Sequence, residues 1–369
     1  MTSNPLDHKK IIENLANLKV SRNSIFPYFK IHKNKFLRLV LDLTDRCNLR
    51  CKMCFFNFPE KKKSMPDMSN KTFNLIASQI FPISSHLTLS CMAEPLLYKK
   101  FPEVLSEVSK HEFLYSEYVT NGMLLNSRII EKSIEANIST VQISFDGAKP
   151  ETLEKIRIGA NFKKIIDNIQ MFNKIKSDYK VKHPFIRFNY VIMKDNVNEV
   201  VDVVKLAREI GVNEINFRHL VPLKGLGVKL QSLKYNKSNS DTYLHKAKED
   251  AQKFGISLIG FPLLEPETNN EDKFHNSLCD KRCFLPWEQV HILPDGRIIP
   301  CPFWYNEKAF GDLNETSFDS IWNSDNYNLL RWELETGRWR KICRTCPFRV
   351  LGDIYSGNFE EEVMWGPSI

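Results

Sequence analysis

The chain of 369 residues is 42% hydrophobic, 11% aromatic and 26% charged, a globular composition that excludes an intrinsically disordered protein. Its length suits a large α/β domain with a smaller companion. The formal net charge of +8 is too modest to indicate nucleic-acid binding. We interpret the basic stretches Lys61–Lys63 and Lys224–Lys253 as solvated faces, or alternatively as a surface for an acidic partner.

The distribution of charge also argues against export and against a membrane span. Residues 1–20 carry Asp7, Lys9 and Glu13 where a signal peptide requires an apolar core. No uncharged apolar run is long enough to cross a bilayer. We therefore expect a cytoplasmic protein, in which nine cysteines favour metal ligation over disulfides.

Short β-rich runs alternate with amphipathic helical runs from residue 36 to about residue 223. The expected strands cover residues 36–43, 86–90, 115–120, 140–145, 185–192 and 214–219. The expected helices cover residues 69–80, 101–110, 127–136, 162–176 and 198–210. Ser69, Asn126, Asn161 and Asn196 are placed to cap helices, and Gly211 to end the last one. The alternation predicts a parallel α/β sheet with crossover helices, whose carboxyl ends gather the chemistry.

The pattern changes after residue 223, where a polar stretch is followed by a helix over 240–254 and a strand over 256–264. Residues 266–276 are typical of a linker, and Gly296 marks a hairpin turn in the cysteine-rich segment beyond it. The predicted organisation is an N-terminal extension (1–35), a core (36–225), a helix, strand and linker (226–277), a cysteine-rich module (278–350) and a tail (351–369).

Cys47, Cys51 and Cys54 follow the first expected strand with the spacing C-x3-C-x2-C. Soft thiolate ligands select iron-sulfur clusters, zinc or cuprous copper. A four-iron cluster normally takes four cysteines, so three in one loop leave one iron without a protein ligand. Such an incomplete site indicates catalysis, because structural metal sites are closed. A zinc knuckle, or three unrelated buried thiols, is the alternative interpretation.

This cysteine loop resembles that of the radical S-adenosylmethionine (SAM) enzymes. The resemblance implies a partial (β/α)6 TIM-like barrel in which Cys47, Cys51 and Cys54 hold a [4Fe-4S] cluster. It also implies that the amino and carboxylate groups of SAM bind the open iron. A flavodoxin-type or ferredoxin-type donor would supply the electron that cleaves SAM to a 5'-deoxyadenosyl radical, which takes hydrogen from the substrate.

The resemblance extends to further residues of the predicted core. Met92–Pro95 matches the family's Gly-Gly-Glu-Pro run, which implies that Ala93 and Glu94 contact the SAM ammonium, although Met92 departs from the pattern. Met53 stands where the family often has an aromatic residue, so its surroundings should pack on adenine.

Ile143–Gly147 resembles the family's Ser-x-Asp-Gly run after the fourth strand. By this resemblance Ser144 and Arg157 bind the SAM carboxylate or ribose, since a guanidinium pairs well with a carboxylate. The alternative for Arg157 is a surface ion pair with Glu154.

A second set of cysteines resembles the SPASM/twitch module of the same enzymes, and is closer to the shorter twitch form because no cysteine follows the last pair. The resemblance implies one auxiliary [4Fe-4S] cluster held by Cys283, Cys301, Cys343 and Cys346. Cys279 is a spare, or replaces Cys283. A four-cysteine zinc site is the alternative, since C-x2-C pairs also bind zinc.

Two further residues are candidates for direct roles. Cys91 follows the second strand, and its thiol could donate a hydrogen atom to a substrate radical, which makes it the candidate catalytic residue. A buried thiol that packs as a small hydrophobe is the alternative. His219, after the sixth strand, could be a base or a substrate ligand, or a structural histidine.

The resulting expectation is an enzyme that dehydrogenates or epimerises a small polar substrate such as a sugar, an aminocyclitol or another alcohol. The shorter auxiliary module and the 35 or so residues before the first strand favour this reading over peptide chemistry. The alternatives are a maturase of a ribosomally made peptide or protein side chain, and a non-catalytic iron-sulfur or zinc protein.

Overall fold

The structure is a computed structural model, and it describes residues 35–57, 65–90, 92–222, 225–233, 237–260, 262–264, 283–344 and 346. Several sequence expectations lie outside these residues and stay predictions. They are residues 1–34 of the N-terminal extension, Lys61–Lys63, Cys91, the linker over 266–276, Cys279 and the tail over 351–369.

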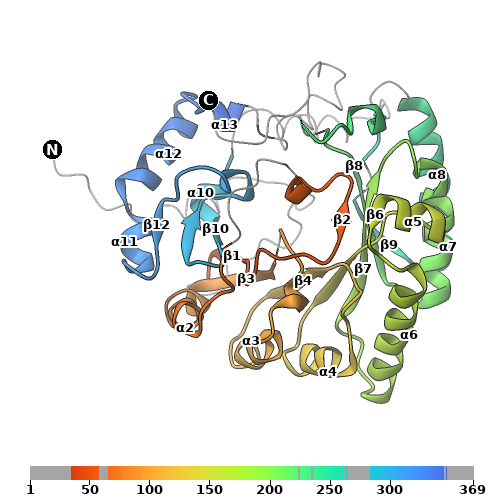
Figure 1. Ribbon diagram of the computed structural model, residues 1–369, viewed down its shortest axis with the longest axis horizontal. Coiled ribbons are helices and arrows are strands. Elements are labelled where there is room, and N and C mark those ends of the chain that lie inside the picture. The colour runs from red at the N-terminus through yellow and green to blue at the C-terminus, as the bar shows by residue number, and fades with distance from the viewer. Residues whose placement is uncertain are drawn as a thin grey trace.

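A ten-stranded sheet forms the centre of the fold, in the order β12-β11-β10-β1-β3-β4-β5-β7-β8-β9. Seven of its strands run parallel in chain order: β1 (Leu37–Leu41), β3 (Ser84–Leu89), β4 (Tyr115–Thr120), β5 (Thr140–Ser144), β7 (Phe185–Ile192), β8 (Glu214–His219) and β9 (Ser257–Gly260). The sheet curves but does not close within the described residues, since β12 and β9 stand at its two ends (Figure 1). The predicted partial TIM-like barrel is confirmed.

Helices cover the outer, convex face of this sheet (Figure 1). They are α2 (Asn70–Gln79), α3 (Phe101–Val108), α4 (Ser127–Glu135), α6 (Phe162–Asp178), α7 (Val200–Ile210) and α8 (Lys237–Phe254). A shorter helix, α5 (Pro150–Ile156), follows β5. Single 3-10 turns are η1 (Phe55–Asn57), η2 (Phe81–Ile83), η3 (Pro95–Leu97), η4 (Val197–Glu199) and η5 (Lys229–Gln231).

The predicted helix starts are confirmed at three of four capping residues. The side chains of Ser69, Asn126 and Asn161 accept hydrogen bonds from backbone N–H groups of the first helical turns, as expected of N-caps. Asn196 does not cap its helix, so that expectation is wrong. Its amide instead accepts from Met193 N at 2.7 Å and donates to the carbonyl oxygens of Asp146 and Val191, which ties the ends of β5 and β7 together.

The cysteine-rich module extends the core sheet. Its strand β10 (Gln289–Ile292) pairs parallel with β1, and β11 (Arg297–Ile299) and β12 (Gly311–Asp312) follow as antiparallel neighbours. At this junction the buried His291 Nε2 lies 2.6 Å from Asp42 Oδ2, and Asp42 N donates to Ile292 O at 3.0 Å. The remaining described elements of the module are η6 (Pro302–Trp304), α10 (Leu285–Glu288), α11 (Phe318–Trp322), α12 (Asp325–Glu335) and α13 (Lys341–Arg344).

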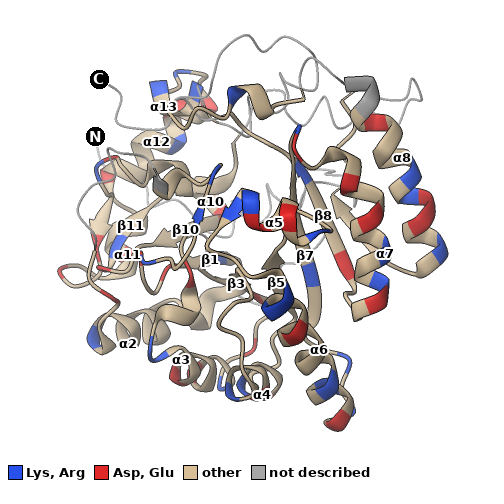
Figure 2. Cartoon of the chain, turned by 45° about the vertical axis from the view of Figure 1, so that its right-hand side comes forward, with Lys and Arg blue, Asp and Glu red and all other residues tan. Residues whose placement is uncertain are grey.

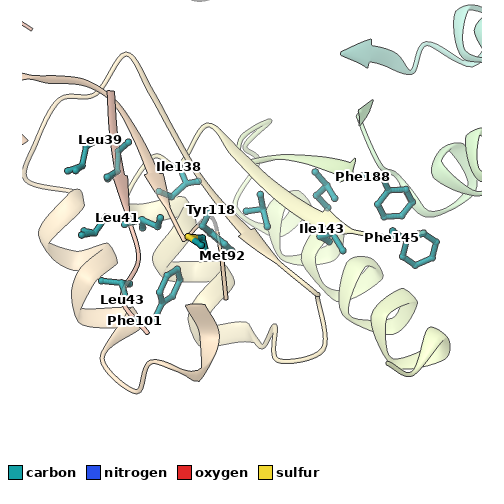
Figure 3. Close-up of a cluster of buried hydrophobic side chains, with 14 of the residues drawn as sticks. Leu39, Leu41, Leu43, Met92, Phe101, Tyr118, Ile138, Ile143, Phe145 and Phe188 are labelled. Carbon is teal, nitrogen blue, oxygen red and sulfur yellow. The ribbon is translucent and has the colours of Figure 1, made fainter. Parts of the chain in front are cut away.

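Alternate side chains of each strand point outward into one continuous hydrophobic core beneath the helices. Figure 3 shows part of this core, with Leu39 and Leu41 of β1 on one side and Ile143 and Phe188 of β5 and β7 on the other. Phe145 stacks on Phe188 with ring centres 4.3 Å apart. The other set of side chains faces the inside of the curved sheet, and many of these are polar.

Charged residues are dispersed over the outer helices. Lys or Arg segments alternate with Asp or Glu segments along α6, α7 and α8 (Figure 2). This distribution fits the interpretation of scattered lysines as solvated faces. None of the described helices combines the length and the apolar character that a membrane span requires.

The turn between β10 and β11 gives a first test of the fold. Gly296 has φ of +92°, and a Cβ atom there would lie 2.4 Å from Asn314 Nδ2 and 3.0 Å from Thr72 Cγ2. We expect Gly296→Ala to cost about 1–2 kcal/mol for the left-handed backbone and roughly 1–3 kcal/mol more for the clash, measured by urea unfolding. Gly337, with φ of +75° and open space around its Cα, is the matched control and should show the backbone cost alone. Equal losses of stability in Gly296→Ala and Gly337→Ala would mean that the contact between residue 296 and Asn314 is not made.

Candidate functional site

The cysteine loop lies between β1 and η1, and a two-stranded sheet that the sequence did not reveal shapes it. β2 (Arg50–Cys51) pairs antiparallel with β6 (Arg157–Ile158), so that Cys51 lies opposite Arg157. Within the loop, Cys54 N donates to Cys51 O at 3.0 Å, and Leu49 N donates to Cys47 Sγ at 3.4 Å. These contacts curl the loop so that all three cysteines belong to one compact turn.

Electrostatic interactions between the three cysteines indicate that their sulfur atoms lie close together. Burial raises the pKa of Cys54 to about 11, and the charges of Cys51 and Cys47 add to the rise. Burial also raises the pKa of Cys47 and of Cys51. Metal ligands must be thiolates, and three thiolates in this environment need a cationic group to compensate them. The donor set therefore fits a cationic metal cluster.

Hydrogen bonds tie the cysteine loop to the carboxyl ends of β3 and β4. Asn48 Oδ1, between the first two cysteines, accepts from Asn121 Nδ2 at 2.8 Å. Arg46 O accepts from Glu94 N at 3.0 Å. The Arg46 guanidinium in turn forms a bidentate ion pair with Asp67, with Nη2 at 2.6 Å and Nε at 3.1 Å from the carboxylate oxygens. The loop is thus held rigidly at the strand ends, where the sequence predicted that the motifs would meet.

Glu94 is buried and accepts three hydrogen bonds from its surroundings. Its donors are the Thr120 hydroxyl at 2.7 Å, Asn121 N at 2.7 Å and Leu96 N at 3.2 Å. Burial raises the pKa of Glu94 to about 7 even though these donors act to lower it. A carboxylate can accept about four hydrogen bonds, so one acceptor position remains on Glu94 for a further donor.

The Met92 side chain packs into the hydrophobic core and not toward the inside of the curved sheet. Its side chain belongs to the hydrophobic core, where Figure 3 shows it among the buried residues, and its N–H lies 3.3 Å from Asp42 Oδ1. The methionine side chain that replaces the first glycine of the family pattern therefore fills space in the hydrophobic core. The next residue, Ala93, is partly buried and accepts from the Ser90 hydroxyl through its carbonyl oxygen at 3.2 Å.

Arg157 forms a buried ion pair, but with Asp146 and not with Glu154. Its Nη2 lies 2.6 Å from Asp146 Oδ2, and its Nη1 lies 3.7 Å from Cys51 Sγ. The Glu154 carboxylate instead accepts from Phe162 N at 2.9 Å. Arg157 Nε is buried and has no hydrogen-bond partner among the described residues. An unsatisfied guanidinium nitrogen beside a thiolate loop fits an anionic group of a bound cofactor.

Ser144 and Met53 are the two remaining residues that the resemblance assigns to the cofactor. Ser144 ends β5 and is partly exposed. Met53 packs against a small hydrophobic cluster at the strand ends, formed by Ile156, Met193, Leu220 and Val228. Through Met53 this apolar cluster adjoins the cysteine loop, and its apolar character suits an adenine ring.

The second cysteine set comes from separate segments of the module. Cys283 precedes α10, Cys301 precedes η6, Cys343 lies in α13 and Cys346 follows it. Burial raises the pKa of Cys301 well above its usual value, and the charges of Cys346, Cys283 and Cys343 each add to the rise. The four sulfur atoms are therefore electrostatic neighbours, although 17 residues lie between Cys283 and Cys301 and 41 between Cys301 and Cys343.

No three Cys, His, Asp or Glu side chains in the described part of the chain converge tightly enough to hold one metal ion. A four-iron cluster does not require such convergence, because each thiolate binds a different iron. Both cysteine sets are consistent with that wider spacing.

Aromatic side chains join the two cysteine regions, a contact that the sequence did not reveal. Phe55, directly after the third cysteine, meets the ring of Tyr305 edge-on with centres 5.7 Å apart. Phe56 lies 6.2 Å from the same ring. Tyr305 follows Cys301 by four residues, so the packing fixes one cysteine region against the other.

His219 is buried at the end of β8, and its Nε2 lies 2.8 Å from Pro262 O, consistent with a donated hydrogen bond and a structural role. Burial lowers its pKa to about 4 from the ordinary value of 6.5. Between these values the unfolded chain binds a proton at this residue and the folded chain does not, so stability falls as the pH falls. We expect the wild type to lose about 2–3 kcal/mol more than His219→Gln between pH 7 and pH 4.5, measured by urea unfolding. Parallel pH profiles would contradict the neutral buried imidazole.

Comparison with known families finds one match for each of the two cysteine-containing regions. The model of the radical SAM superfamily matches residues 41–207, and the model of the SPASM iron-sulfur cluster-binding domain matches residues 283–347. Together they contain all seven described cysteines.

Three curated relatives align over most of the chain. The tungsten-containing aldehyde ferredoxin oxidoreductase cofactor-modifying protein of Pyrococcus furiosus is 24% identical over 85% of this chain and 88% of its own length. The PqqA peptide cyclase of Gluconobacter oxydans is 23% identical over 84% and 82%. The antilisterial bacteriocin subtilosin biosynthesis protein AlbA of Bacillus subtilis is 24% identical over 94% and 72%.

Two solved structures share the fold. Streptococcus suis SuiB bound to SAM superposes with a TM-score of 0.63 at 16% identity, covering 90% of this chain and 74% of SuiB. The enzyme anSMEcpe with bound AdoMet and a peptide superposes with a TM-score of 0.62 at 18% identity, covering 89% and 92%.

Proposed function

Because the chain belongs to the radical SAM superfamily and carries a C-terminal SPASM domain, we propose that it is an enzyme that modifies a ribosomally made peptide or a protein side chain. The similarity to PqqA peptide cyclase and to the subtilosin biosynthesis protein, which spans both domains, is the observation that carries this proposal. SuiB, which shares the fold, has also been solved with its precursor peptide SuiA. A small sugar-like or aminocyclitol substrate, which the sequence favoured, finds no support among these relatives.

The inner face of the sheet supports a peptide substrate. Gln142 of β5, Asn189 of β7 and Asn216 of β8 lie on the side of their strands opposite the hydrophobic core. Asn189 Nδ2 donates to Gln142 Oε1 at 2.7 Å, and the Asn216 amide lies 3.2 Å from Asn189 Oδ1 and 3.0 Å from the Arg218 guanidinium. Amide side chains both donate and accept, so this row matches the alternating N–H and C=O groups of a peptide backbone.

We assign the site residues as follows. Cys47, Cys51 and Cys54 would hold the [4Fe-4S] cluster that, with SAM bound, supplies a 5'-deoxyadenosyl radical to take a hydrogen atom from the substrate. Arg157 would bind the SAM carboxylate through its unsatisfied Nε. Glu94 would accept from the SAM ammonium, with the Ala93 backbone beside it, while Ser144 would contact the carboxylate or ribose and Met53 the adenine. Cys283, Cys301, Cys343 and Cys346 would hold an auxiliary cluster that accepts the electron left on the oxidised substrate.

The experiment uses the anaerobically purified, iron-loaded protein with SAM and dithionite. Short peptides encoded beside its gene, and a panel of sugars and aminocyclitols, are added separately. We expect a peptide to raise 5'-deoxyadenosine release and to lose hydrogen, detected by mass spectrometry. Stimulation by a sugar or an aminocyclitol and by none of the peptides would contradict the proposal.

A further inference from the structure

The strand that carries Cys51 has an exposed outer side. Successive side chains of a strand point to opposite faces, and in β2 and β6 the buried Cys51 and Arg157 point inward. Their neighbours Arg50 and Ile158 point outward, and Ile158 is 50% exposed. Arg50 Nη1 donates to Cys47 O at 2.9 Å and to Leu49 O at 2.8 Å, so a guanidinium covers the back of the cysteine loop.

Two lysines flank this outer side. Lys155 of α5 lies 2.9 Å from Asp195, and Lys52, between two of the loop cysteines, lies 4.0 Å from the same carboxylate. Lys52 N also donates to Ile156 O at 3.0 Å, which fixes the loop against α5. Figure 2 shows α5 near the centre of the view. The Lys52 side chain is 38% exposed, and the Lys155 side chain is 58% exposed.

The same surface continues onto the turn that contains η5. Asp195 N donates to Gln231 Oε1 at 3.1 Å, and Lys194 N donates to Gln231 O at 2.9 Å. The residues before Gln231 are the exposed Lys229 and Leu230, and Leu230 is 85% exposed. We call this surface the β2–β6 face, formed by Arg50, Lys52, Lys155, Ile158, Lys194, Lys229 and Leu230. With Asp195 it holds five cations and one anion.

We propose that the β2–β6 face is the docking surface for a small acidic one-electron donor protein of the flavodoxin or ferredoxin class. Cations around two exposed aliphatic side chains suit an acidic partner with an apolar contact at its redox centre. The face also lies directly behind the backbone of the cysteine loop, which keeps the path for the electron short. In the step, the reduced donor would lose one electron to the cluster that Cys47, Cys51 and Cys54 would hold, with no change in the covalent bonds of either protein.

A peptide substrate fits this face less well than a donor does. The hydrogen atom must be taken on the inner side of the loop, where Arg157 and Cys51 point, whereas every residue of the β2–β6 face is exposed or partly exposed on the outside. The inference does not depend on whether the substrate is a peptide, because it concerns only the reductant.

The test compares the variant Lys155→Glu/Lys229→Glu with a matched control, Lys205→Glu. Lys205 is 51% exposed and lies 3.4 Å from Asp202 on α7, away from the cysteine loop. The probe is a bacterial flavodoxin with an acidic surface. We expect its dissociation constant, measured by biolayer interferometry at low ionic strength, to rise about tenfold for the double variant and to stay unchanged for the control. Added salt should reduce the difference in dissociation constant between the double variant and the wild type.

A second measurement excludes misfolding. With dithionite as the reductant, 5'-deoxyadenosine release should be the same in the wild type and both variants, whereas flavodoxin-driven release should fall about tenfold in the double variant alone. Unchanged flavodoxin affinity would overturn the proposal. So would a raised KM for a peptide substrate under dithionite without loss of flavodoxin affinity, because the face would then bind substrate.

Discussion

Replacing Cys54 by alanine should reduce SAM cleavage to the background and remove one cluster. Cys54 belongs to a compact loop with two other thiols, and a four-iron cluster that already lacks a fourth cysteine depends on all three as ligands. Iron counting on anaerobic protein should fall from about eight to about four atoms per chain, since each cluster holds four. Release of 5'-deoxyadenosine with dithionite gives the activity.

Cys343→Ala is the matched variant in the second cysteine set. It should also lose about four irons per chain, yet it should keep SAM cleavage that is no longer coupled to product. The reverse pattern, with cleavage lost in Cys343→Ala and kept in Cys54→Ala, would contradict the assignment of the two clusters. Zinc in place of iron in both proteins would remove the basis for radical chemistry.

Replacing Arg157 by methionine should destabilise the protein severely. Its partner Asp146 is fully buried, and the ion pair spans 2.6 Å. Removal of one member leaves an uncompensated buried charge, which costs about 3–5 kcal/mol. The free energy of unfolding in urea should show this loss. Arg128→Met, which removes a surface pair with Glu103, should change it by about 0–1 kcal/mol.

The double variant Asp146→Asn/Arg157→Met separates folding from cofactor binding. Asparagine keeps an acceptor for Val191 N, which lies 2.7 Å from Asp146 Oδ1, and removes the buried charge. We expect most of the lost stability to return, while the KM for SAM stays raised because no guanidinium faces the cysteine loop. Recovery of SAM affinity together with stability would show that Arg157 has a purely structural role.

The regular elements of the core were predictable from the sequence because each depends on local signals. The predicted strand over 185–192 coincides with β7, and the helix over 162–176 ends only two residues before α6 does. A capping asparagine or a glycine with φ of 76° at residue 211 acts on its own neighbours and can be read without tertiary knowledge.

The features that the sequence did not predict depend on tertiary contacts. The two-residue strands β2 and β6 are too short to carry a periodic pattern and exist because they pair with each other. Asn196 stands where a helix cap is expected from the sequence. Its side-chain amide instead donates to the backbone carbonyl groups at the ends of β5 and β7. Met92 similarly departs from a family pattern because the core beside it has room for a side chain.

Of the two strands that pair with β1, β3 is synthesised early and β10 only late in the chain. His291 meets Asp42 across 249 positions of sequence, and at about 5–20 residues per second the ribosome needs on the order of tens of seconds to bridge that interval. During this time one edge of β1 has unpaired backbone N–H and C=O groups, and such exposed edges promote aggregation. A truncated chain that ends before β10 would keep this border permanently. The N-terminal half is therefore a poor candidate for separate expression, and metallation of its cysteine loop is best attempted on the full-length chain.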